Sequence, residues 1–210
     1  DLRSIQNLVD LPTFQTFLKL CAGRVGQVVN LSSLGQDTGI SHNTAKQWLS
    51  LLQAGFIVHL LPPYYKNFNK RLIKSPKLYF YDTGLVTWLL GIDSKETLKN
   101  HFNLGNIFEN WIISEYIKSR FNKGLSLNGY FWRDKVGHEV DLLISDGENL
   151  TMPEIKSSKT FNINFLKNLD YLKKISSDSI TKINLIYGGD QDQIRGNIKV
   201  YGWKSMQKAF

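Results

Sequence analysis

The spacing of apolar residues predicts that the first third of the chain is helical. Residues Leu11–Cys21 and the segment after Leu31 follow a repeat of about 3.6 residues, typical of helices with one face in a core. Ser41, a favourable N-cap, predicts the start of a further helix. Its apolar residues at i, i+3, i+4 and i+7 form a core-facing stripe of Ala45, Trp48, Leu49 and Leu52. His42, Asn43, Lys46, Gln47 and Ser50 are left on the opposite face.

The segment before this helix, together with the strands after it, predicts a winged helix-turn-helix. Leu31–Asp37 reads as a short helix that ends at Gly39, and a helix, a glycine-containing turn and a second helix make up a helix-turn-helix. Two short strands, Phe56–Leu61 and Leu78–Tyr81, then predict a wing with a basic loop between its strands. His59 lies within the first of these strands, which favours a packed side chain over a ligand.

The pattern of apolar and polar residues changes again after residue 90, where we place the boundary between two domains. Asp82–Leu90 predicts a short helix or turn, and Gly91–Lys95 predicts a linker. We therefore expect two domains, 1–95 and 96–210. In the second domain the predicted elements are a helix at Asn106–Phe121, strands at Tyr130–Arg133, His138–Ile144 and Leu150–Lys156, a helix at Phe165–Ile175, strands at Ile180–Tyr187 and Ile198–Tyr201, and a terminal helix at Trp203–Ala209. This order of helix, three strands, helix and strand predicts an α/β core.

The hairpin of the second domain places charged residues on one face. With Asp146-Gly147 as a two-residue turn, Ser145 is opposite Glu148, and Asp141 is opposite Met152. Asp141, Glu154 and Lys156 then share a face, with the two carboxylates as diagonal neighbours about 7–8 Å apart. His138 has the opposite parity and is left out of this group. Pro153 fits an edge or a bulge better than a central strand, since it cannot donate a ladder hydrogen bond.

A fourth acid, Glu109, has apolar neighbours on its predicted helix. Ile112, Ile113 and Tyr116 lie within about 60° of arc around it. Burying an acid there is costly unless a metal or a lysine pairs with it. For the hairpin residues, the spacing along the strands also fits a second interpretation. In it the hairpin is solvated, and Glu139, Glu154 and Lys156 are ordinary surface charges.

This set of residue types suits the hydrolysis of a phosphodiester. Carboxylates such as Glu109, Asp141 and Glu154 hold Mg²⁺ or Mn²⁺ through oxygen ligands. The metal polarises the phosphoryl group and lowers the pKa of a bound water. Lys156 would orient that water or offset the developing negative charge.

The loop between the two wing strands is strongly basic. It carries Lys66, Lys70, Arg71, Lys74 and Lys77, with no acid among them and with aromatic residues interleaved. Such a loop is suited to phosphates, while His42, Asn43, Lys46 and Gln47 on the preceding helix are suited to the major groove of DNA. Winged helices also dock proteins, so contact with a partner protein alone is the other interpretation of the same residues.

Composition limits the class of protein. The chain has 210 residues, 42% hydrophobic and 21% charged residues, and a formal net charge of +8, so an anionic partner fits. A single cysteine excludes an intramolecular disulfide framework and favours a reducing compartment. With no leader pattern and no run of about 18 apolar residues, we expect a cytoplasmic protein with no membrane partner. Because the chain starts without methionine, we also expect it to be a piece of a longer protein.

Several ordered motifs resemble the PD-(D/E)XK nuclease superfamily. They are Gly105-Asn-Ile-Phe-Glu109-Asn-Trp, Phe131-Trp-Arg, Glu139-Val-Asp141-Leu-Leu-Ile and Glu154-Ile-Lys156-Ser-Ser. With the run from Asn69 to Leu85, they more narrowly resemble the C-terminal region of a prokaryotic family of AAA-type ATPases, a region catalogued as a domain of unknown function. The resemblance implies a winged helix joined to a restriction-endonuclease-like domain. It implies catalytic roles for Glu109 as the helix acid, Asp141 as the strand acid, and Glu154 and Lys156 as the E-x-K pair.

The resemblance also implies an upstream ATPase domain in the full-length chain. The present chain has no G-x-x-x-x-G-K-(S/T) phosphate loop, so we expect it neither to bind nor to hydrolyse ATP. The sequence thus leads to two hypotheses. One is a DNA-interacting fragment with a Mg²⁺-dependent nuclease-like site, and the other is a non-catalytic module that docks a partner protein.

Overall fold

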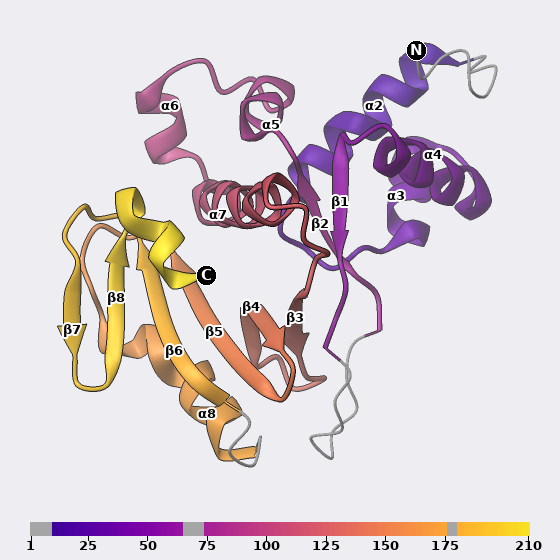
Figure 1. Cartoon of the computed structure of the whole chain (residues 1–210). Coiled ribbons are helices and arrows are strands. Elements are labelled where there is room, and N and C mark those ends of the chain that lie inside the picture. Colours follow the sequence, from indigo (N-terminus) through magenta and orange to yellow (C-terminus); the bar gives the residue numbers. More distant parts are fainter. Residues whose placement is uncertain (1–9, 65–73, 176–179) are drawn as a thin grey trace. The chain divides into compact units, whose positions relative to one another are not determined.

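The chain folds as a mixed α+β structure that divides into two compact units. The computed structural model describes residues 10–64, 74–175 and 180–210, without the side chains of residues 168, 170, 172 and 175 (Figure 1). The first unit comprises Asp1–Leu60 and Ser75–Asn110, and the second comprises Leu61–Lys74 and Trp111–Phe210. The division is spatial and falls within one helix, whereas the boundary expected from the sequence, near residues 92–100, is a position along the chain and stays a prediction.

From residue 10 onward, the described part of the first unit starts with three helices, whose ends follow from local capping. They are α2 (Leu11–Gly23), α3 (Leu31–Thr38) and α4 (His42–Ala54). The side chains of Asp10, Asn30 and Ser41 accept N-cap hydrogen bonds from Thr13, Ser33 and Thr44. Gly39 ends α3 with a left-handed φ of 78°, a conformation that glycine adopts without a steric cost. The predicted stripe on α4 is confirmed, because Ala45, Trp48, Leu49 and Leu52 are all buried.

The remainder of the first unit is a two-stranded sheet followed by helices. Strands β1 (Val58–Leu61) and β2 (Lys77–Phe80) pair with each other. Helices α5 (Thr83–Leu89), α6 (Lys95–Asn100) and α7 (Leu104–Asn122) follow. The sequence did not predict α6, which begins where Ser94 caps Thr97. Phe17, Cys21, Leu52 and Phe80 are fully buried in the core of this unit.

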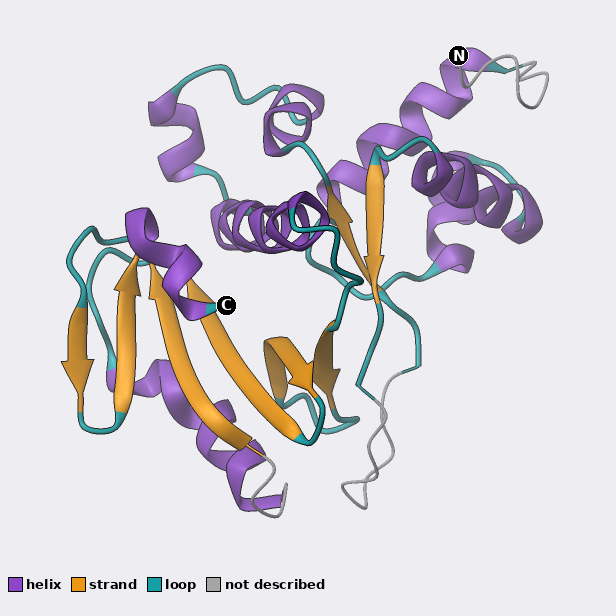
Figure 2. Ribbon diagram, in the orientation of Figure 1, coloured by secondary structure: helices purple, strands orange, loops and turns teal. Residues whose placement is uncertain are grey.

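The second unit is built on a six-stranded mixed sheet with the order β3-β4-β5-β6-β8-β7 (Figure 2). Its strands are β3 (Gly129–Arg133), β4 (Glu139–Asp146), β5 (Asn149–Lys156), β6 (Ile180–Tyr187), β7 (Gln193–Arg195) and β8 (Ile198–Gly202). Pairs β3–β4, β4–β5 and β7–β8 are antiparallel, whereas β5–β6 and β6–β8 are parallel. The short strand β7 was not predicted from the sequence.

Helices connect and follow these strands. The 3₁₀ turn η1 (Ile163–Leu166) leads into α8 (Lys167–Ile175), and η2 (Trp203–Ala209) follows β8. The β5–α8–β6 connection joins two parallel neighbours, which cannot be linked by a tight turn. Leu169 of α8 is buried with Trp132, Leu143 and Met152 of the sheet. Among the helices of the described residues, none is both long enough and apolar enough to cross a bilayer.

His59 on β1 makes the stability of the first unit sensitive to acid. Burial lowers the pKa of His59 from its usual 6.5 to about 4. The unfolded chain therefore takes up the proton at a higher pH than the folded chain does. The contribution of neutral, buried His59 to stability is fully present above pH 6.5 and is lost as the pH drops from 6.5 towards 4. We expect the urea midpoint to fall between about pH 7 and pH 4.5, and to fall less in His59→Phe. Equal falls in the two proteins would contradict the assignment.

Candidate functional site

The β4–β5 hairpin brings Asp141 and the Glu154-x-Lys156 pair together, but its register differs from the predicted one. Ser145 pairs with Leu150 and Asp146 with Asn149, so Gly147-Glu148 is the two-residue turn. The positive φ of 62° falls on Gly147, the first central position, as in type II′ turns. The predicted Asp146-Gly147 turn is therefore one residue too early, and the register that placed Asp141 opposite Met152 is wrong by two residues. A shift of two preserves the parity, so the three side chains still share a face.

Pro153 lies at the point where β4 and β5 separate. The β4–β5 ladder ends at Ile144 and Thr151, whereas the ladder with β6 continues through Pro153 to Lys156. β5 is thus a central strand, and Pro153 is accommodated there because the ladder on the β4 side has ended. Two residues further, the N–H of Ile155 donates to Oδ2 of Asp141 at 3.1 Å. The carboxylate thereby replaces a strand carbonyl, which fixes Asp141 against β5.

Lys156 lies between the two carboxylates. Its Nζ is 2.6 Å from Oε1 of Glu154 and 3.7 Å from Oδ2 of Asp141. The side chains of Glu154 and Asp141 are 1% and 10% exposed, whereas that of Lys156 is 33% exposed. Two buried carboxylates around one ammonium carry a formal charge of −1. Because burial of a carboxylate is costly without a cation, the Lys156 ammonium offsets part of the cost of burying these two side chains.

Glu109, the fourth predicted member, contacts two residues of the first unit. Its Oε1 accepts hydrogen bonds from Nζ of Lys77 at 2.9 Å and from Oη of Tyr79 at 2.5 Å. Both partners are on β2. The next residue, Asn110, continues the attachment of α7 to this unit, because its Oδ1 accepts from the N–H of Phe80 at 2.6 Å. Glu109 therefore has a local cation, and its sharing of one metal with Asp141 and Glu154 stays a prediction.

Among the described residues, no group of three or more His, Cys, Asp or Glu side chains is arranged to hold a metal ion. Within the second unit, the candidate metal ligands are the pair Asp141 and Glu154. Oxygen atoms from two neighbouring strands fit a cation that retains several waters, such as Mg²⁺. Because the Lys156 ammonium lies against both carboxylates, a bound cation would have to displace or share its position.

The residues predicted to bind DNA divide into three groups. His42, Asn43, Lys46 and Gln47 are exposed on α4, and Lys74 is exposed before β2. Lys66, Lys70 and Arg71 lie outside the described residues. Lys77 is a correction, because its side chain is only 1% exposed and is paired with Glu109. A buried ammonium cannot contact a phosphate, so Lys77 is not part of the proposed DNA-binding surface.

Sequence reasoning missed a buried cluster at the β3–β4 turn. Asp134 accepts hydrogen bonds from the backbone N–H groups of Val136, Gly137 and His138 and from Nδ1 of His138 at 2.9 Å. Burial raises the pKa of Asp134, but hydrogen bonds from His138 and Gly137 outweigh it and the net pKa is lowered. The His138 ring stacks on Tyr171, with centroids 3.9 Å apart. An Asp four residues before a His, across a glycine turn, was the available signal.

Comparisons with known proteins match both parts of the chain. Residues 1–96 match a family model described as a domain of unknown function (DUF8612), and residues 104–206 match another described as a domain of unknown function (DUF4143). The chain is 28% identical over 163 residues to "Uncharacterized protein Rv2008c" of Mycobacterium tuberculosis and to "Uncharacterized protein Mb2031c" of Mycobacterium bovis. The match covers 78% of this chain and 36% of each relative, so the chain spans about a third of their length.

Proposed function

We propose that the second unit is a Mg²⁺-dependent nuclease-like domain, and that the chain is the DNA-interacting C-terminal region of an AAA-type ATPase. The observation that carries the proposal is the buried trio, in which Lys156 lies 2.6 Å from Glu154 and 3.7 Å from Asp141. A purely solvated hairpin would not bury two carboxylates on neighbouring strands.

The order of elements supports the PD-(D/E)XK assignment. Helix α7 precedes β3, β4 and β5, and α8 then leads to β6. Asp141 on β4 and the E-x-K pair on β5 occupy the strand positions that the resemblance implies. A divalent metal held by Asp141 and Glu154 would supply Lewis-acid chemistry to a phosphoryl group. Lys156 would hold its ammonium beside that group and offset negative charge as it develops.

The first unit supports a winged-helix role in DNA contact. Among the described residues, helices α2, α3 and α4 precede the β1–β2 pair, and α4 presents an exposed polar face with Lys46 and His42. Such a face is suited to the edges of bases and to phosphates in the major groove. The relatives extend well beyond the matched 36% of their length, which leaves room for the proposed ATPase domain.

A non-catalytic docking module is the second candidate. The observation that favours it is the pairing of Glu109 with Lys77 and Tyr79, which gives the helix acid a structural role. In that case Asp141, Glu154 and Lys156 would form an internal ion-pair group, and the chain would use its surfaces to bind a partner protein.

A metal titration separates the two candidates. We expect calorimetry to detect binding of Mn²⁺ or Mg²⁺ to the wild-type chain, and Asp141→Asn to weaken it by at least about tenfold, because a ligand is lost. Glu148→Gln is the matched control, since Glu148 is an exposed carboxylate in the turn of the same hairpin. Absence of metal binding by the wild-type chain, or equal binding by all three proteins, would favour the docking module.

A further inference from the structure

Lysines gather around the beginnings of β6 and β8 in the second unit. Lys182 lies on β6, Lys199 on β8 and Lys208 on η2, and the side chains of all three are exposed. The strands are parallel neighbours, and Asn184 of β6 pairs with Lys199 of β8. The three lysines line one cavity of about 190 Å³, which we call the β6–β8 groove.

Apart from Ile183, the other residues that line the β6–β8 groove have hydrogen-bonding side chains. Thr181, Asn197 and Tyr201 line it with the lysines. Lysine, threonine, asparagine and tyrosine side chains are among those that contact phosphate oxygens in complexes with nucleic acid. The groove therefore combines positive charge with neutral donors, as a site for phosphate groups requires.

The charge of the groove is only partly neutralised. Lys208 donates to Oδ2 of Asp192 at 2.8 Å, and the pKa of Lys208 is raised, first by that hydrogen bond and then by the charge of Asp192. Within the part of the chain that the structure describes, Lys182 and Lys199 form no ion pair. The acids of the β4–β5 turn, Asp146 and Glu148, do not line the groove. Its net charge is thus about +2, which favours an anionic occupant.

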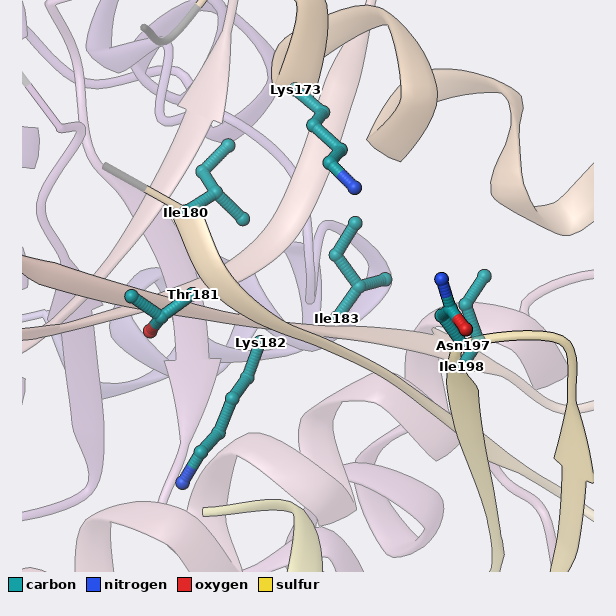
Figure 3. Close-up of a pocket in the computed structure, with 7 residues that line it drawn as sticks. All are labelled: Lys173, Ile180, Thr181, Lys182, Ile183, Asn197 and Ile198. Atoms are coloured by element: carbon teal, nitrogen blue, oxygen red, sulfur yellow. The ribbon is translucent and has the colours of Figure 1, made fainter. Parts of the chain in front are cut away.

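A second cavity adjoins the groove and shares Thr181, Lys182, Ile183 and Asn197 with it. It has a volume of about 410 Å³ and is lined by Ile180, Ile183 and Ile198 together with Lys173. Figure 3 shows that Lys173 and Ile183 are on one side of the strand, whereas Lys182 extends from the opposite side. With three isoleucines and two lysines, this cavity is less suited to a phosphate than the groove, which has one isoleucine and three lysines. The β6–β8 groove is therefore the better candidate.

We infer that the β6–β8 groove binds the phosphate backbone of a nucleic acid. It is a contact surface separate from Asp141, Glu154 and Lys156. By register, Glu154 pairs with Leu185, and Lys182 lies three residues earlier on β6. At a rise of about 3.3 Å per residue, Lys182 lies about 10 Å along the strand from the level of Glu154. Alternation along β6 places Lys182 on the face opposite Leu185. The inference rests on the DNA-binding part of the proposed function and not on catalysis.

The test is a pair of charge-neutralising double variants of the whole chain. Lys182→Gln/Lys199→Gln removes two groove charges, and Lys135→Gln/Lys167→Gln removes two exposed charges outside the groove. Binding of a labelled DNA duplex is followed by fluorescence anisotropy in EDTA over a range of salt concentrations. We expect the groove variant to lose about tenfold in affinity and its salt slope to fall by about 2, while the control variant changes little.

Two other results of this experiment would contradict the proposal that the groove binds nucleic acid. Equal affinities and slopes for the groove variant and the wild-type chain would overturn the inference. Binding of poly-glutamate with the same dependence on Lys182 and Lys199, and no binding of DNA, would assign the groove to an acidic protein instead. Hydrolysis of bis(p-nitrophenyl) phosphate with Mn²⁺ tests the catalytic proposal separately. Absence of this hydrolysis, with DNA binding by the groove retained, would contradict the catalytic proposal and support the groove proposal.

Discussion

Glu109→Ala is expected to destabilise the first unit by about 3–5 kcal/mol, because it removes a carboxylate that is paired with the buried Lys77 ammonium. The Lys77 side chain is 1% exposed and lies 2.9 Å from Glu109. The same carboxylate also accepts a hydrogen bond from the hydroxyl of Tyr79, a side chain that is fully buried. Removing Glu109 thus deprives two buried groups on β2 of an acceptor.

The effect can be measured by urea unfolding of the full chain, with Glu115→Ala as the matched control. Glu115 lies on the same helix and pairs with Lys118, but both side chains are partly exposed, at 27% and 44%. A surface pair of this kind contributes at most about 1 kcal/mol. Equal losses for Glu109→Ala and Glu115→Ala would show that the buried pair has no special role.

A second variant keeps this prediction testable if Glu109→Ala does not fold. Lys77→Met combined with Glu109→Leu replaces the ion pair with apolar side chains of similar size. Such replacements are often neutral or stabilising, whereas loss of one partner is not. We expect the double variant to be more stable than Glu109→Ala. If it is less stable, the tyrosine contact and not the charge pair holds α7 to β2.

This pairing also shows why a boundary before α7 would disrupt the first unit. Glu109 and Asn110 contact Lys77, Tyr79 and Phe80 of β2, and all five residues belong to that unit. The second family match begins at residue 104, ahead of these two residues. A chain cut there would lose the buried partner of Lys77.

The elements that the sequence predicted well are those with a strong local signal. On α4 the apolar residues repeat at helical spacing and Ser41 caps the first turn, so both the helix and its buried face followed from neighbouring residues. Short elements gave no such pattern. Helix α6 has no buried residue, and β7 spans only three residues. Periodicity needs several residues in a core before it becomes visible.

The part of the candidate site that was predictable is the part that depends only on which face of a strand each side chain occupies. Asp141, Glu154 and Lys156 share a face in both the predicted and the observed register, because the two differ by an even number of residues. The turn itself was misplaced, since Asp146-Gly147 and Gly147-Glu148 both offer a glycine with positive φ. The burial of Lys77 could not be predicted, because its partner Glu109 is 32 residues away. Its position among other cations instead indicated a surface loop.

Lys156→Ala is expected to abolish cleavage of DNA while strengthening metal binding. The ammonium lies 2.6 Å from Glu154, where it neutralises a carboxylate that a metal would need. Its removal takes away a like charge near the cation, so we expect the affinity for Mn²⁺ to rise by about tenfold. Cleavage of plasmid DNA should fall by about 100-fold or more, because charge developing on the phosphoryl group loses its stabilising partner.

The two readouts together identify the role of Lys156. Asp141→Asn is the comparison, because it should lose metal binding and cleavage together, whereas Lys156→Ala should separate them. Lys156→Arg keeps the positive charge but changes its geometry, so partial cleavage by that variant would assign charge, not exact position, as the main contribution. Cleavage by Lys156→Ala at the wild-type rate would exclude Lys156 from the reaction. If the wild-type chain binds no metal and cuts no nucleic acid, the buried trio is an internal ion-pair group, and its loss should then change the urea midpoint alone.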